Sequence, residues 1–151
     1  MSSSIHLHKR HNVSLLLYHI VISTKYRRFV LSPKVDRILR KTCLDIQDRY
    51  EIHFLEIGSD KNHIHFLIQS VPIYSPTKIT RIIKSITACE IFSQAPGVKR
   101  ALWGGSFWGI GFYINTVGRH SNEKVIATYV KNQGLEDEYE VLHKNPQLNL
   151  F

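Results

Sequence analysis

The sequence from residue 52 to residue 71 reads IHFLEIGSDKNHIHFLIQSV, and it decides the fold. Residues 52–57 and 63–71 are two runs rich in isoleucine, leucine and phenylalanine, which favour β-strands. Residues 59–62, Ser-Asp-Lys-Asn, are turn formers. Because the connection is short, the two runs are predicted to pair as an antiparallel hairpin.

Two histidines alternate with apolar residues in the second run. His63 and His65 are two apart, so on a strand they point to one face, while Ile64 and Phe66 point to the other. Two imidazoles side by side can bind one divalent metal ion. The chain has nine histidines and a second H-x-H at residues 6–8. Spacing alone therefore leaves open whether the pair is a site or half-buried strand filler.

The segments before and after the hairpin predict further strands and two helices. Residues 14–24, SLLLYHIVIST, read as a buried strand. Ser32-Pro33 and Ser75-Pro76 each combine an N-cap serine with a proline suited to the first helical position, and apolar residues follow each pair at helical spacing. Residues 102–118 are rich in glycine and aromatic residues, which suggests short strand pieces. The clustered aromatic residues could stack on unpaired bases, but a core or interface position is favoured for Trp103 and Phe112.

A last helix is predicted over residues 121–133, with Ser121 as its cap and Gly134 after its end. The element order is then β-α-β-β-α-β-α. This order predicts an α+β fold of the ferredoxin-like or RRM-like type, with an antiparallel sheet and two helices on one face. The last helix would lie near the other face, beside His63 and His65.

Composition bounds the class of protein. The 151 residues, 43% hydrophobic, predict one domain with a core over residues 1–151, in which 1–12 are a flexible N-terminal tail and 135–151 a C-terminal tail. The two cysteines form no C-x-x-C motif and are expected to act as small hydrophobes in a reducing compartment. No signal-peptide pattern is present, so a cytoplasmic protein is expected.

Positive charge is concentrated in the first third of the chain. The formal net charge is +8, and residues 1–50 contribute +7 of it. A basic surface of this kind indicates a polyanion partner, most often nucleic acid, although a solvated basic surface remains open. The candidate DNA-binding residues are Lys25, Arg27, Arg28, Lys78, Arg81 and Lys84.

Tyr129 and Gln133 are four residues apart, so they share one face of the predicted last helix. A lone tyrosine is usually a packing residue, because its hydroxyl is a poor nucleophile at neutral pH. With a metal ion on His63, His65 and the Gln133 amide oxygen, Tyr129 could attack a phosphodiester, release a 3′-hydroxyl and keep a 5′-phosphotyrosine bond. Ligand softness favours Mn²⁺ and cellular abundance favours Mg²⁺.

Four motifs in order resemble the HUH endonucleases. His63-Ile64-His65 matches the HUH motif, and residues 18–28, YHIVISTKYRR, resemble the opening strand of the single-tyrosine transposases of the insertion-sequence group two hundred/six hundred and five. Trp103-Gly104 with residues 115–118, and then residues 129–134, resemble that family's tyrosine helix and its approach. REP-associated tyrosine transposases are close relatives of this family.

The resemblance, over about residues 18–134, implies a homodimer that binds single-stranded DNA hairpins at element ends and cuts and rejoins single strands. It implies His63, His65 and Gln133 as metal ligands and Tyr129 as the nucleophile, with the tyrosine of one subunit completing the histidine site of the other in many members. Many members carry an acidic residue before the first histidine. Here that residue is Asn62, from which we expect tuning of the site rather than loss.

Three alternatives stay open at this stage. One is a cellular relative that processes repeated hairpin sequences without moving an element. Another is a non-catalytic nucleic-acid-binding domain of the same architecture, which is disfavoured because the third strand carries histidines where RNA-recognition modules carry aromatic residues. A zinc hydrolase is weakened by the lack of a third histidine, cysteine or carboxylate at a suitable spacing.

Overall fold

The predicted hairpin is the outer half of a four-stranded sheet. In the computed structural model, which describes residues 6–118, β4 (His53–Ser59) pairs antiparallel with β5 (His63–Ser70). The register shifts between Phe54 and Glu56, so Leu55 sits at a bulge. Residues beyond the bulge still alternate strictly, and Ile57 lies opposite Phe66.

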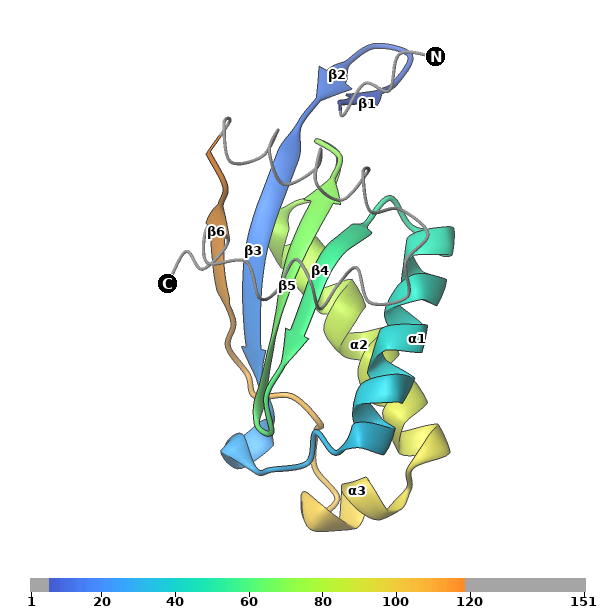
Figure 1. Ribbon diagram of the computed structural model, residues 1–151, viewed down its shortest axis with the longest axis vertical. Coiled ribbons are helices and arrows are strands. Elements are labelled where there is room, and N and C mark those ends of the chain that lie inside the picture. Colours follow the sequence, from blue (N-terminus) through green and yellow to red (C-terminus); the bar gives the residue numbers. More distant parts are fainter. Residues whose placement is uncertain (1–5, 119–151) are drawn as a thin grey trace.

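The strand predicted over residues 14–24 forms the centre of the sheet as β3 (Leu16–Ser23). It pairs antiparallel with β5 on one side and with β6 (Tyr113–Thr116) on the other, which gives the order β4-β5-β3-β6 (Figure 1). This is the predicted ferredoxin-like arrangement, in which the first and third strands of the β-α-β-β-α-β unit are central. The α+β fold class is therefore confirmed.

Both predicted long helices form and cover the same face of the sheet (Figure 1). They are α1 (Pro33–Arg49) and α2 (Pro76–Gln94), which pack on each other. The Ser32 hydroxyl accepts a hydrogen bond of 3.2 Å from the Val35 N–H, and the Ser75 hydroxyl accepts one of 3.1 Å from the Lys78 N–H. Each serine thus satisfies a backbone donor that the first turn leaves unpaired, as the Ser-Pro pairs predict.

The core lies between these helices and the sheet. Ile64 and Phe66 of β5 are fully buried there, as the alternation in residues 63–71 predicts. Cys43 is also fully buried, and burial raises the pKa of its thiol. It behaves as the small hydrophobe expected, whereas Cys89 is exposed, so that expectation was wrong for Cys89.

The glycine- and aromatic-rich region departs most from expectation. It is preceded by a short helix that the sequence did not predict, α3 (Gly97–Ala101). Trp103 and Phe112 are 69% and 40% exposed, so neither is a core residue, and their prediction as interface residues stays a prediction. The neighbouring Phe107 and Trp108 are buried instead, and the Trp108 indole N–H donates to the Thr87 hydroxyl at 2.9 Å.

The N-terminal region also contains structure within the predicted tail. Within residues 1–12, the short strand β1 (Leu7–His8) pairs antiparallel with β2 (Val13–Ser14). The helix predicted over residues 121–133 and the tail over 135–151 lie outside the described residues. Within residues 6–118, neither long helix is apolar enough to cross a lipid bilayer.

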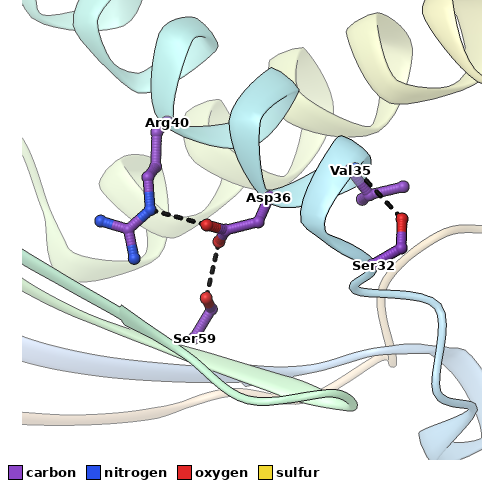
Figure 2. A network of polar contacts seen from close by, with 5 residues as sticks. All are labelled: Ser32, Val35, Asp36, Arg40 and Ser59. Carbon is purple, nitrogen blue, oxygen red and sulfur yellow. Dashed lines mark hydrogen bonds and ion pairs between the residues drawn. The ribbon is translucent and has the colours of Figure 1, made fainter.

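A polar network joins the start of α1 to the end of β4 (Figure 2). One carboxylate oxygen of Asp36 accepts a hydrogen bond of 2.6 Å from the Ser59 hydroxyl, and the other accepts one of 2.9 Å from Arg40 Nε. Ser59 immediately precedes the turn that leads to His63. The network therefore anchors one side of this turn to the helix layer.

We expect Asp36→Ala to lower the free energy of unfolding by about 1–3 kcal/mol, because it leaves Ser59 and Arg40 without their charged acceptor. Urea denaturation would measure this. Asp45→Ala, at an exposed position on the same helix, serves as the control and should change stability by about 0.5 kcal/mol or less. Equal losses in the two variants would show that the network contributes nothing specific.

Candidate functional site

The histidine pair lies on the sheet face opposite the two long helices. His63 and His65 are half-buried, their ring centroids are 6.4 Å apart, and the ring planes differ by only 20°. Across the sheet, His63 lies opposite Ser23, and His65 lies between Val21 and Gly58. The two rings therefore stand side by side above a rigid part of the sheet, as the H-x-H spacing predicts.

The residue before the pair orients the first ring. The Asn62 side-chain oxygen lies 2.9 Å from His63 Nδ1, so it can accept the Nδ1–H hydrogen bond. An imidazole that donates from Nδ1 presents Nε2 as its ligand atom, and contacts of this kind fix the orientation of metal-binding histidines. Asn62 thus supplies an acceptor at a position that is acidic in many members of the family this sequence resembles.

A third histidine, His19 on β3, contacts the second ring. His19 Nε2 lies 3.4 Å from His65 Nδ1, and the two rings meet edge to face with centroids 5.5 Å apart. In a hydrogen bond between these two nitrogens, one donates and the other accepts, and which does so depends on the tautomers of the rings. His19 was not among the predicted site residues. Its signal in the sequence was a histidine within the mainly apolar residues 15–22, and in the structure this side chain is 5% exposed.

The described residues supply two of the predicted metal ligands. Within residues 6–118 there is no cluster of three or more histidine, cysteine, aspartate or glutamate side chains that could hold an ion. His63 and His65 provide two imidazole nitrogen atoms, a type of ligand that suits a divalent ion. Gln133, the predicted third ligand, and Tyr129, the predicted nucleophile, lie outside the described residues.

The predicted DNA-binding residues divide between two surfaces. Lys25, Arg27 and Arg28 follow β3 in a short 3₁₀ turn (Lys25–Arg27), and both arginines are exposed. On α2, Lys78 and Arg81 are exposed. A groove of about 620 Å³ brings Lys25 together with Arg81 and Lys84, between α2 and residues 106–112. Lys78 does not line this groove.

Lys84 has a structural role as well. Its ammonium group donates hydrogen bonds to the carbonyl oxygens of Gly109, Ile110 and Gly111, at 2.7, 3.0 and 2.9 Å. These contacts use all three donors of the ammonium group, and burial lowers the pKa of Lys84. Lys84 therefore holds the loop that leads to β6, a role that differs from its prediction as a DNA-binding residue.

A buried carboxyl group lies on the same sheet face as the histidines. Glu56 is 4% exposed and lies opposite Leu67, which in turn lies opposite His19. Burial raises the pKa of Glu56 from 4.5 to about 7. The face thus carries a buried carboxyl group with a raised pKa in addition to the histidines, and perturbed pKa values of this kind cluster at functional sites.

Comparison with known proteins identifies relatives across most of the chain. The family described as "Transposase IS200 like" matches residues 12–133. The ISDra2 transposase TnpA of Deinococcus radiodurans is 30% identical over 120 residues, covering 78% of this chain and 84% of that protein. The transposase for insertion sequence element IS200 of Salmonella typhimurium is 32% identical over 124 residues, covering 80% of this chain and 78% of that protein.

Solved structures agree with these relatives. A crystal structure of a candidate transposase from Deinococcus radiodurans R1 has a TM-score of 0.68 at 28% identity, covering 84% of this chain and 97% of that one. A REP-associated tyrosine transposase bound to a REP hairpin has a TM-score of 0.53 at 12% identity, covering 85% and 75%. The second likeness, at this low identity, extends only to the fold.

We expect Glu56→Gln to stabilise the protein in a pH-dependent way. The pKa of Glu56 is 4.5 in the unfolded chain and about 7 in the folded chain. The free energy of unfolding therefore falls as the pH rises through this window, and the full loss of stability is present above it. The difference corresponds to about 3 kcal/mol at most. Urea denaturation of variant and wild type should diverge at about pH 8 and agree near pH 4. An equal difference in the free energy of unfolding at both pH values would contradict the raised pKa of Glu56.

Proposed function

Because the chain belongs to the IS200-like transposase family, whose members cleave and rejoin DNA, we propose that it acts on single strands at hairpin-bearing element ends through a 5′-phosphotyrosine intermediate. The observation that carries this proposal is the geometry of His63 and His65, which stand parallel on the open face of the sheet. The family match covers residues 12–133 and therefore includes this pair, Tyr129 and Gln133.

The proposed reaction assigns one role to each group. His63 and His65, with the Gln133 amide oxygen, would hold Mg²⁺ or Mn²⁺, which supplies Lewis-acid stabilisation of charge on the scissile phosphate. The Tyr129 oxygen attacks phosphorus and loses its proton, the bond to the 3′-oxygen breaks, and that oxygen leaves as a 3′-hydroxyl. The new bond between tyrosine and the 5′-phosphate conserves the ester, so a different 3′-hydroxyl can reverse the step and join a new strand.

The proposed substrate and assembly follow from the same reasoning. Exposed Arg27, Arg28 and Arg81 can neutralise phosphates of a DNA hairpin and its flanks. A relative of this fold was solved bound to a REP hairpin, which supports a hairpin as the substrate. We also propose a homodimer, in which Tyr129 of one subunit reaches the histidine pair of the other. The 30–32% identity to insertion-sequence transposases favours a mobile element over a cellular hairpin-processing enzyme.

Tyr129→Phe should abolish a covalent protein–DNA adduct while leaving hairpin binding intact, because it removes only the attacking oxygen. Wild type and variant would be incubated with hairpin-bearing single-stranded DNA and Mg²⁺ or Mn²⁺, and the adduct followed on a denaturing gel. A mobility-shift assay with the same DNA would measure binding.

An adduct of unchanged yield in Tyr129→Phe would exclude this residue as the nucleophile. Binding without any adduct, in the wild type as well, would favour a non-catalytic nucleic-acid-binding domain. If neither a covalent adduct nor a bound complex forms, hairpin-bearing single-stranded DNA is excluded as the substrate.

His63→Ala should abolish metal-dependent cleavage, because a single remaining imidazole on β5 cannot hold the ion firmly. The control is His8→Ala, which disrupts the second H-x-H of the sequence in the short strand β1. Calorimetric titration with Mn²⁺ should show that the wild type and His8→Ala bind the ion and that His63→Ala has lost at least about tenfold in affinity. Cleavage by His63→Ala at the wild-type rate would contradict the proposal that His63 is a metal ligand.

A further inference from the structure

The described part of the chain has three non-glycine residues with positive φ, and all three lie in one surface cluster. They are Tyr26 (57°), Arg27 (52°) and Trp103 (53°). Side chains of this size are unfavourable in the left-handed region, and such conformations concentrate at binding sites, where the surrounding structure holds them. Tyr26 and Arg27 follow β3, whereas Trp103 follows α3, so the tertiary structure brings them together.

The cluster has the geometry of an open aromatic surface. The Tyr26 and Trp103 rings meet at a centroid distance of 5.2 Å and an angle of 60°, and the Arg28 guanidinium lies 4.6 Å from the centre of the Trp103 ring. Despite these contacts, Tyr26 is 61% exposed and Trp103 is 69% exposed. We name Tyr26, Arg28 and Trp103 the stacking platform.

Thr24 connects the stacking platform to the histidine pair. Its backbone N–H donates to the Asn62 carbonyl oxygen at 2.9 Å. Its hydroxyl lies 2.8 Å from the Arg28 carbonyl oxygen and 3.1 Å from that of Asn62. Thr24 is buried, so one rigid junction positions both the turn that carries Tyr26 and the residue that orients His63.

A groove of about 490 Å³ is lined both by residues of β3 and by the turn that follows it. Its lining includes Val21 and Ser23 of β3 and Tyr26 and Arg27 of the turn. Val21 and Ser23 are the direct cross-strand neighbours of His65 and His63. A strand of nucleic acid that follows this groove from the histidines would reach the stacking platform.

The surrounding charge selects the class of ligand. Residues 25–35 and 91–118 contain no acidic residue, whereas Lys25, Arg27 and Arg28 border the exposed rings. Lys25 Nζ itself lies 5.4 Å from the centre of the Tyr26 ring. Aromatic rings bordered by cations bind unpaired bases, which stack on the rings while phosphates meet the charges. A duplex stem offers few such bases, because its bases already stack on one another.

We propose that the stacking platform binds an unpaired nucleobase of the single strand that flanks a hairpin. This inference rests on the proposed function for the identity of the DNA, and it adds a second contact point beyond the histidine pair. Every base has a π-face, so the stacking platform would prefer unpaired bases over paired ones with little preference for sequence.

The two tryptophans of the chain provide a direct test. Trp103 is exposed, whereas Trp108 is 4% exposed and hydrogen-bonded to Thr87. The Tyr129→Phe variant is used so that the DNA stays uncut. A hairpin with a single-stranded thymidine flank should quench its tryptophan emission, and the same hairpin trimmed to a blunt stem should not. Adding Trp103→Phe should remove the quenching, since only the buried Trp108 then remains.

Affinity measurements separate stacking from simple apolar contact. Trp103→Leu should weaken binding of the flanked hairpin by about tenfold and binding of the blunt hairpin by less than about twofold. Trp103→Phe keeps an aromatic face and should retain most of the affinity. Thermal melting of each variant reports whether it is folded, and the quenching of Trp103 in its native position tests the proposal even where Trp103→Leu does not fold.

The outcomes distinguish this inference from the proposed function. If wild type forms the covalent adduct but the flank does not quench Trp103, the stacking platform is overturned and the function stands. If Trp103→Leu lost equal affinity for the flanked and the blunt hairpin, the stacking platform would also be overturned. If neither DNA binds, both proposals fail together. Quenching by the flanked hairpin alone, lost in Trp103→Phe, supports the stacking platform.

Discussion

The register of β3 against β5 is the constraint on which the rest of the structure depends. Eight residue pairs, from Leu16 opposite Ser70 to Ser23 opposite His63, are antiparallel and without a shift. In this register Ile20 and Ile22 share the buried face with Ile64 and Phe66, all fully enclosed. A slip of one residue would turn every side chain of one strand over, so the imidazoles would enter the core and the apolar side chains would leave it. Each buried isoleucine or phenylalanine contributes about 1.5–3 kcal/mol, so the core selects this register strongly and places the histidine pair as a consequence.

The same pairing organises the end of the sheet where the candidate chemistry lies. Beyond the last pair, backbone hydrogen bonds continue from Thr24 to Asn62, from Lys25 to Phe107 and from Gly109 to Ser23. Lys84 holds the loop from the helix side, and Asp36 holds Ser59. The histidine pair and the stacking platform therefore rest on one hydrogen-bonded junction.

The open face of the sheet differs chemically from the core face. It carries His19 against His65, and Glu56 with a raised pKa, in strands whose other face is mainly apolar. Buried polar and titratable groups reduce stability unless they are well compensated. Their concentration on one face, together with three strained backbone positions beside it, is the pattern expected where a surface is selected for chemistry and ligand binding.

The sequence by itself determined the strands of the main sheet, its two long helices and their order, but not α3 or the pair β1 and β2. Alternation in residues 63–71 predicted which side chains of β5 are buried, and two Ser-Pro pairs predicted where both helices begin, because these signals depend only on neighbours along the chain. The pairing of His63 with His65 on one face was predictable for the same reason. Only the tertiary structure decided that His19 contacts His65, that Lys84 binds loop carbonyls, and that Trp103 is exposed beside Tyr26. These contacts join residues 25 to 77 positions apart, and the exposure of Trp103 depends on which other segments cover its side chain. Local sequence patterns contain no information about partners that lie so far away along the chain.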